Sequence, residues 1–206
     1  GLAGTSLFEE VLGNARRCPP QLLRQELGTP CIRTVHRLDA AVSGLMVYAR
    51  SAKAASLLSE QLRSRTFGKE YLAVVHGVPE GGVMTDLLGR DPVRRRTYVA
   101  AEPGKDVRPA ELSYEVLGSR EGLSLVRIRL HTGRTHQIRA SMAWIGHPLL
   151  GDGKYGKLDK RYDRKYQALY SYKLTFRFTT DAGCLAYLDG KTFQVESVDF
   201  VQEYFT

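Results

Sequence analysis

Apolar and β-branched residues form four runs whose length and spacing are typical of β-strands. These runs cover residues 45–49, 69–77, 112–117 and 123–130. Residues 69–77 are rich in Val, Tyr and Leu and end at a glycine, which predicts a central strand. In residues 123–130, Arg127 and Arg129 interrupt the apolar positions, so one face of that strand is expected to be wetter than the other.

Other segments carry apolar residues at the three- and four-residue spacing of an amphipathic helix. Ser51 is the expected N-cap of one helix, whose apolar positions are Ala54, Ala55, Leu57, Leu58 and Leu62. Thr135 is the expected N-cap of a second helix ending at Gly146, with an apolar face formed by Ile138, Met142 and Ile145. Near the N-terminus, a Pro-Pro pair separates two short amphipathic segments, 7–12 and 22–27.

The remaining segments predict a hairpin, a loop and a strand-rich tail. Residues 80–109 are expected to form a hairpin excursion whose basic tip carries Arg94, Arg95 and Arg96. Residues 154–166 form a basic, Tyr-rich loop, and residues 170–205 alternate as several strands would. Many strands and few helices predict an α+β protein with a mixed, largely antiparallel sheet, and we expect residues 1–206 to form a single domain.

Charge is the informative part of the composition. With 43% hydrophobic and 25% charged residues among 206, the chain is typical of a globular protein. Its net charge of +8 favours a polyanionic partner, with nucleic acid first and acidic proteins or anionic lipid as alternatives. No apolar run approaches the roughly 20 residues of a membrane span. The first residues also lack a secretory signal pattern, so we expect a cytoplasmic protein.

The three cysteines, Cys18, Cys31 and Cys184, are scattered and odd in number. No C-x-x-C pair is present, so neither a disulfide framework nor a zinc knuckle is indicated. We expect reduced, buried thiols.

Asp39 is the first candidate for chemistry. It lies between basic residues and a Ser-Gly turn that leads into the apolar run at 45–49. A carboxylate fixed at the mouth of a strand is both well positioned and reachable, as a reactive acid must be. The alternative is a turn aspartate that accepts hydrogen bonds from local backbone amides.

Three motifs stand in one order along the chain: His36-Arg37-Leu38-Asp39 followed by Ser43-Gly44-Leu45, then Lys69-Glu70-Tyr71-Leu72-Ala73-Val74-Val75-His76-Gly77, then Gly133-Arg134-Thr135-His136-Gln137-Ile138-Arg139. Together they resemble the RluA family of RNA pseudouridine synthases. A further segment, Gly146 to Asp152, continues the resemblance, which is close over residues 34–155. The resemblance implies the pseudouridine synthase fold.

The chain departs from the family pattern in several places. Val42 stands where the family usually has Thr, and Ser141 where it often has His. Family members commonly begin with further strands, so the resemblance implies a truncated or shortened catalytic domain, without an S4-like RNA-binding domain. Residues 195–205 match the family poorly.

The resemblance implies an isomerase that converts uridine to pseudouridine without a cofactor. Asp39 would be the essential carboxylate, attacking the anomeric carbon or removing a ribose proton; the sequence leaves both roles open. Tyr71 matches the aromatic that stacks on the flipped base, with a hydroxyl available for removal of the C5 proton. Arg139 matches the arginine that pairs with the carboxylate, where a bidentate guanidinium would orient it and favour its ionised form. Arg37 would enter the RNA stack where the target base leaves.

Other basic and polar residues are candidate RNA contacts, with solvated loops as the alternative: His36, Arg134, His136, Gln137, Arg94, Arg95 and Arg96. The expected partner is structured RNA, ribosomal or transfer, bound by a monomer. Two rivals remain: a non-catalytic RNA-binding or RNA-folding protein that retains the fold, and a metal-dependent hydrolase. The second would need His36, His131 and His136 as ligands, but their spacing fits no metal motif, so no metal is expected.

Overall fold

The structure is a computed structural model that describes residues 19–206. The elements are α1 (Pro19–Glu26), β1 (Arg33–Thr34), β2 (Ser43–Gly44), β3 (Tyr48–Ala49), α2 (Ala52–Ser64), β4 (Gly68–His76), β5 (Gly82–Asp91), β6 (Arg96–Val99), β7 (Val107–Arg120), β8 (Leu123–Leu130), α3 (Gln137–Trp144), β9 (Leu169–Thr175), the 3₁₀ helix η1 (Gly183–Leu188), β10 (Thr192–Gln194) and α4 (Asp199–Phe205).

One large sheet organises the fold. Its strands follow the order β10-β9-β4-β8-β7-β5-β6, and every neighbouring pair in this order is antiparallel. The short strand β2 adds a parallel pairing to β9, while β1 and β3 form a separate two-stranded sheet. The expected α+β fold with a mixed, largely antiparallel sheet is therefore confirmed.

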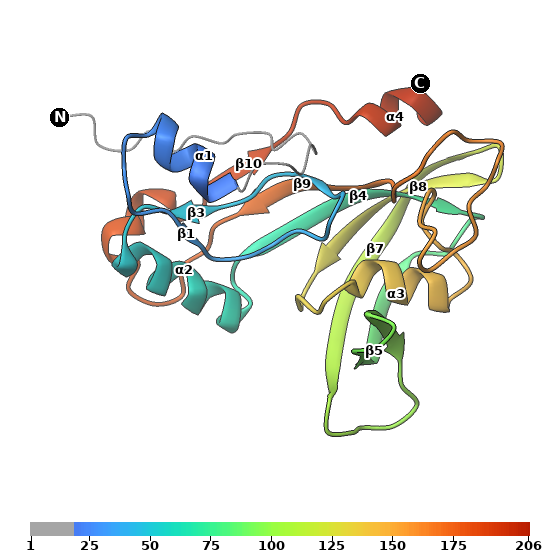
Figure 1. The fold of residues 1–206 in the computed structure, drawn as a ribbon, viewed down its shortest axis with the longest axis horizontal. Helices are drawn as coiled ribbons and strands as arrows, with labels where there is room; N and C mark the ends of the chain where they lie inside the picture. Colours follow the sequence, from blue (N-terminus) through green and yellow to red (C-terminus); the bar gives the residue numbers. More distant parts are fainter. Residues whose placement is uncertain (1–18) are drawn as a thin grey trace.

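Strand β4 lies near the middle of the sheet and contributes to a core on each face. Tyr71, Ala73 and Val75 pack with residues of α3, β7 and β8. Leu72 and Val74 point to the other face and pack with Phe200 of α4. Figure 1 shows the same layering, with α2 and α3 on one side of the sheet and α4 on the other. Alternation along one buried strand thus fixes which face carries each functional side chain.

Several elements form where their sequence predicts. Ser51 caps α2, and its side chain accepts a hydrogen bond from the Ala54 amide. Strands β4 and β8 cover the segments expected around 69–77 and 123–130, and β5 and β6 form the expected hairpin with its basic turn. Strand β7 is longer than the expected 112–117, because it also pairs along β5 from Val107 onward.

The expected strand at 45–49 is wrong as a single element. The chain pairs with β9 only at β2 and with β1 only at β3, so Leu45 and Val47 are buried between two short pairings. Gly44 explains how the chain can pass so close to β9. Its φ is +120°, and a Cβ there would lie 2.3 Å from the Ser171 carbonyl oxygen. Only glycine lets the backbone approach β9 this closely.

Two further expectations are corrected. The N-cap of α3 is His136, in the left-handed conformation with φ of +52°, and not Thr135. The tail at 170–205 contains η1 and α4 besides β9 and β10. Phe200 lies in α4 and packs against the sheet, so this part of the tail is a helix and not a further strand.

The N-terminal expectations are only partly covered by the described residues. The segment at 22–27 lies in and just after α1, which begins at Pro19, a position where the missing proline N–H costs no helical hydrogen bond. The segment 7–12 and Cys18 lie outside the described residues. Cys184 is exposed and Cys31 half-buried, so buried thiols are not observed at these two positions. Within residues 19–206, no helix has the length and apolar composition that crossing a membrane requires.

Candidate active site

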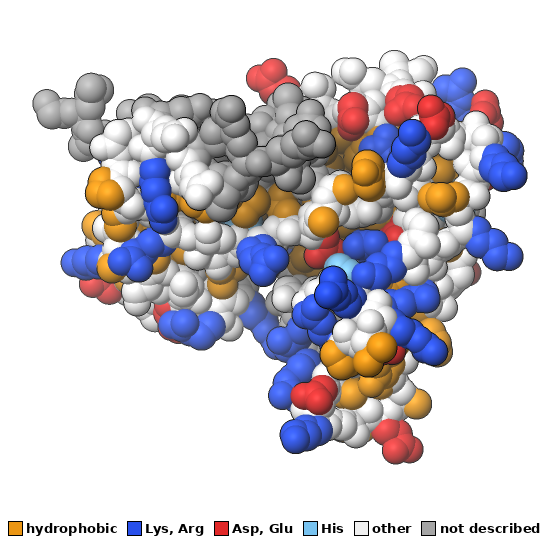
Figure 2. All heavy atoms as spheres, viewed as in Figure 1, with side chains coloured by type: hydrophobic (Ala, Val, Ile, Leu, Met, Phe, Trp, Pro, Cys, Tyr) orange, Lys and Arg blue, Asp and Glu red, His pale blue; other side chains and the backbone are white. Residues whose placement is uncertain are grey.

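A cleft of about 1250 Å³ opens beside β4, between the loop that joins β1 to β2 and the loop that precedes α3. Among the described residues that line it, Asp39 is the one carboxylate. The basic lining residues are Arg37, Arg63, Arg65, Lys69, Arg90, Arg95, Arg134 and Lys154. Figure 2 shows Lys and Arg side chains gathered in the middle of this face and along the protruding β5–β7 region. The cleft therefore suits a polyanion and places one acid within it.

The loop that carries Asp39 is held at both ends and in its middle. At its start, His36 Nε2 accepts a hydrogen bond of 3.0 Å from the Val47 amide. In the middle, Gln167 donates to the Ala40 carbonyl at 2.8 Å, and the Val42 amide donates to the Asp39 carbonyl at 3.0 Å. After the loop, Gly44 of β2 pairs with Ser171 of β9. The backbone of Asp39 is thus fixed without use of its carboxylate.

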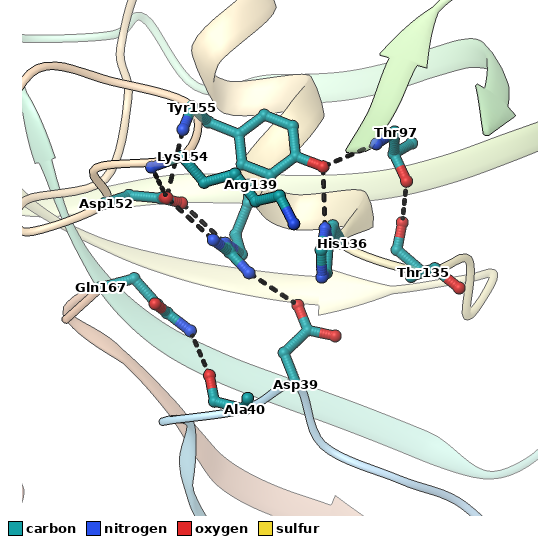
Figure 3. A network of polar contacts seen from close by, with 10 residues as sticks. All are labelled: Asp39, Ala40, Thr97, Thr135, His136, Arg139, Asp152, Lys154, Tyr155 and Gln167. Atoms are coloured by element: carbon teal, nitrogen blue, oxygen red, sulfur yellow. Dashed lines mark hydrogen bonds and ion pairs between the residues drawn. The ribbon is translucent and has the colours of Figure 1, made fainter. Parts of the chain in front are cut away.

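The carboxylate of Asp39 is 24% exposed and faces Arg139, whose Nη1 lies 3.6 Å from Oδ2. Its side chain accepts no backbone hydrogen bond among the described residues, so the alternative of a capping turn aspartate finds no support. Figure 3 shows Asp39 at the end of a polar network that runs through Arg139 to Asp152.

Arg139 pairs primarily with Asp152, which corrects the expected bidentate contact to Asp39. Its Nε and Nη2 donate to the two carboxylate oxygens of Asp152 at 2.7 and 2.9 Å, and both side chains are nearly fully buried. The Asp152 carboxylate also accepts the amides of Lys154 and Tyr155, at 3.1 and 3.2 Å. This pairing occupies one edge of the guanidinium, and Nη1, at the other edge, meets Asp39.

Tyr71 lines the same cleft from β4 and is 6% exposed. Burial, helped by the negative charge of Asp39, raises the pKa of its hydroxyl to about 12, and a hydrogen bond with Ser171 offsets part of that shift. The hydroxyl is therefore neutral near pH 7. The structure brings together all three residues expected to carry the chemistry: Asp39, Tyr71 and Arg139.

Tyr155 connects Arg139 to the loop before α3. The guanidinium carbons of Arg139 and Arg96 lie 5.0 and 4.8 Å from the centre of the Tyr155 ring. Its hydroxyl oxygen accepts the Thr97 amide at 2.7 Å and lies 2.8 Å from His136 Nδ1. Figure 3 draws the contacts of the Tyr155 hydroxyl with Thr97 and His136. Burial lowers the pKa of His136, more than the nearby Asp39 raises it.

Three of the residues expected to contact RNA, Arg37, His36 and Gln137, all line the cleft but differ in how far their side chains are engaged within the protein. Arg37 is exposed and lines the cleft. His36 is held by Val47, and burial, followed by the positive charge of Lys69, lowers its pKa to about 4. Gln137 is 3% exposed. Its amide oxygen accepts from the Thr132 hydroxyl and the Arg134 amide, and its amide nitrogen donates to the Glu111 carbonyl. We therefore assign it a structural role.

The basic residues around the hairpin are also not equivalent. Arg134 lines the cleft and donates to the Pro109 carbonyl at 2.9 Å. Of the three arginines at the hairpin tip, Arg95 lines the cleft, Arg96 stacks on Tyr155, and Arg94 lies 3.9 Å from Asp91.

Four residues important to the site were not assigned from the sequence: Lys69, Asp152, Tyr155 and Gln167. Lys69 and Asp152 lie in segments that resemble the family, 69–77 and 146–152, and this resemblance could have indicated their importance. Lys69 is half-buried in the cleft wall, where burial lowers its pKa, and it makes no ion pair with any described residue. Gln167 lies 127 positions from Ala40, whose carbonyl it binds, and no local sequence pattern predicts such a contact.

Within residues 19–206, no group of three His, Cys, Asp or Glu residues is arranged to hold a metal ion. The three histidines of the metal hypothesis have separate partners. His36 binds the Val47 amide, His131 Nε2 lies 3.0 Å from Ser113 Oγ, and His136 meets Tyr155.

Comparisons with known proteins identify the family of the chain. The family model described as RNA pseudouridylate synthase matches residues 8–144. Ribosomal large subunit pseudouridine synthase D of Nitrosomonas europaea is 42% identical over 153 residues, which are 74% of this chain and 41% of that protein. The Escherichia coli protein of the same name is 44% identical over 124 residues, 59% of this chain and 37% of that protein.

A solved structure, human RNA Pseudouridylate Synthase Domain Containing 1, superposes with a TM-score of 0.65 at 28% identity, covering 86% of this chain and 72% of that one. The chain spans less than half the length of the two bacterial relatives. Since the family model covers most of the chain, including Asp39, Tyr71 and Arg139, the chain belongs to the RNA pseudouridylate synthase family.

Proposed function

We propose that the protein isomerises uridine to pseudouridine in structured RNA, with Asp39 as the essential carboxylate. The observation that carries the proposal is a single acid, facing a buried arginine, in a cleft whose other charged lining residues are Lys and Arg. In this reaction the bond between uracil N1 and the ribose breaks and a bond from C5 replaces it. C5 releases its hydrogen as a proton and N1 gains one, so no cofactor is required.

The geometry supports distinct roles for the three central residues. Asp39 acts at the ribose, either by attack on the anomeric carbon or by removal of a ribose proton, and Arg139 Nη1, 3.6 Å from Oδ2, orients the carboxylate. Because the pKa of Tyr71 is raised to about 12, we assign its ring to stacking on the flipped base and do not assign the hydroxyl as a free base.

RNA enters a cleft whose charge favours the phosphate backbone. Lys69, Arg95 and Arg134 line it and are proposed phosphate contacts. The target base has to leave its stack, which costs a few kcal/mol, and exposed Arg37 is proposed to fill the vacated space. The names of the bacterial relatives favour ribosomal RNA of the large subunit, with transfer RNA as the alternative. The monomeric state and the cytoplasmic location stay predictions.

Release of hydrogen from RNA labelled at uridine C5 tests the proposal directly. Large-subunit ribosomal RNA and transfer RNA are offered separately to the wild-type protein. We expect release from the first, Asp39→Asn to abolish it, and RNA affinity to be largely unchanged in that variant. Asp106→Asn is the matched control, because this aspartate is exposed in the loop between β6 and β7 and has no role in the cleft. RNA binding without release from either pool would favour the non-catalytic alternative.

A further inference from the structure

His136 turns one nitrogen toward the protein and leaves the other to the cleft. Its Nδ1 lies 2.8 Å from the Tyr155 hydroxyl. No hydrogen-bond partner for Nε2 is found among residues 19–206, and the residue lines the cleft. Figure 3 shows the imidazole between the Tyr155 hydroxyl and the Asp39 carboxylate, with its second nitrogen on the side of Asp39. Whatever binds beside Asp39 therefore meets His136 Nε2.

The contacts of Tyr155 favour one position for the imidazole proton. The Thr97 amide donates to the Tyr155 oxygen at 2.7 Å, so the single hydroxyl hydrogen is free to donate to Nδ1. Thr97 is itself held, because its hydroxyl donates to the Thr135 carbonyl at 2.8 Å, directly before His136. Burial raises the pKa of Tyr155, so its hydroxyl keeps its hydrogen. With Nδ1 as acceptor, a neutral His136 carries its proton on Nε2.

Charges of both signs surround His136. Asp39 and Asp152 favour the imidazolium form, whereas Arg139 and Lys154 oppose it. Burial is the largest influence and lowers the pKa of His136 from its ordinary value of 6.5. The neutral form, with its proton on Nε2, is therefore the form that faces the substrate near pH 7.

We propose that His136 binds the target base, donating Nε2–H to a carbonyl oxygen of uracil, and that Tyr155 is the positioning residue that fixes this tautomer. The inference rests on the proposed function. When the bond from N1 to the ribose breaks, its electron pair stays on uracil, and the negative charge spreads to the carbonyl oxygens. This holds for both routes open to Asp39. A donor placed at a carbonyl stabilises that charge as it develops. A phosphate at the same place would be repelled by the Asp39 carboxylate.

The tautomer can be measured without RNA. In protein labelled with ¹⁵N-histidine, long-range ¹H–¹⁵N correlations distinguish a protonated ring nitrogen from an unprotonated one. The His136 signals are identified by their loss in His136→Gln. We expect an unprotonated Nδ1 and a protonated Nε2 at about pH 7 to 8, and a weaker preference for this tautomer in Tyr155→Phe. A proton on Nδ1, or an imidazolium at neutral pH, would overturn the proposal even if no RNA substrate were turned over.

Two substitutions separate the nitrogens of His136 in the C5 release assay. Glutamine carries its amide nitrogen near the position of Nε2, whereas asparagine carries it near Nδ1. We expect His136→Gln to turn over RNA roughly tenfold faster than His136→Asn, with similar RNA affinity for both. The left-handed backbone at this position suits asparagine well, so strain does not explain a slow His136→Asn. Equal rates, or the reverse order, would overturn the donor assignment.

Modified substrates identify the acceptor atom. RNAs with 2-thiouridine or 4-thiouridine at the target site replace one carbonyl oxygen by sulfur, a weaker acceptor. With one of these two RNAs, we expect most of the difference in turnover rate between wild type and His136→Asn to disappear. If only a 2′-deoxy target removes it, the acceptor is a ribose hydroxyl and the proposal is wrong. Failure of the proposed function looks different, because wild type would then release no hydrogen from any RNA.

Discussion

Asp152→Asn tests whether a buried ion pair holds the arginine of the site in place. The Asp152 carboxylate is 1% exposed and accepts two hydrogen bonds from Arg139 and two from backbone amides. The substitution removes the charge and can turn an amide N–H toward Arg139 Nε, where an acceptor is needed. Arg139 would remain buried, with Asp39 at 3.6 Å as its remaining acidic partner.

The expected cost follows from the burial of both partners. Removing one partner of a buried pair typically costs about 3–5 kcal/mol. Asparagine keeps one oxygen for the backbone amides, so we expect a loss of about 2–4 kcal/mol in the free energy of unfolding. For a chain of this size, that lowers Tm by roughly 5–15 °C. Turnover should fall as well, because Arg139 loses the contact that points Nη1 at Asp39.

Urea denaturation followed by far-ultraviolet circular dichroism measures this loss, and an unchanged slope against urea would show that the same surface is exposed on unfolding. Glu115→Gln is the control. It removes the acid of another carboxylate–arginine pair, with Arg127, but both side chains there are largely exposed. An exposed pair contributes between about 0 and 1 kcal/mol. If Asp152→Asn is no more destabilising than Glu115→Gln, the buried pair is not what positions Arg139.

Three other predictions address the loop, the cleft wall and the close approach to β9. Burial lowers the pKa of His36 to about 4, so protonation of His36 favours the unfolded chain as the pH falls from 6.5 toward 4. In His36→Gln the free energy of unfolding should therefore fall less over this pH range, by up to about 3 kcal/mol. Lys69→Met should weaken RNA binding in fluorescence anisotropy and reduce its salt slope by about one, whereas the exposed control Lys105→Met should not. Gly44→Ala should lower Tm clearly, since its Cβ would collide with Ser171, and an unchanged Tm would contradict the reading of β2.

The elements that the sequence predicts well are those determined by local pattern. Strand β4 is predictable because its apolar residues fill both faces of a central strand, and α2 because Ser51 and the apolar spacing agree. The split of 45–49 is not predictable in this way. It depends on the approach of Gly44 to Ser171, which lies far along the chain. Likewise, alternation in the tail does not reveal that Phe200 packs from a helix.

At the site, the sequence identifies which residues meet but not how they are paired. Asp39 and Asp152 both stand in turn-like contexts. The turn role belongs to Asp152, which accepts the amides of Lys154 and Tyr155 while it holds Arg139. The carboxylate of Asp39 accepts no described amide and is left to the cleft. Tertiary geometry decides which of the two carboxylates forms the bidentate pair with Arg139. Spacing along the chain does not predict it.

The four residues from His36 to Asp39 read as one motif, yet they serve different physical needs. His36 and Leu38 belong to the fold: one accepts the Val47 amide, and the other packs against the core beside Tyr71. Arg37 is exposed, and the Asp39 carboxylate accepts no backbone hydrogen bond among the described residues, so both side chains stay available in the cleft. Since His36 is held neutral by burial, it adds no positive charge beside Lys69. A histidine inside this motif can therefore fix the loop that carries Asp39, and the pH dependence of the stability of His36→Gln measures that role separately from turnover.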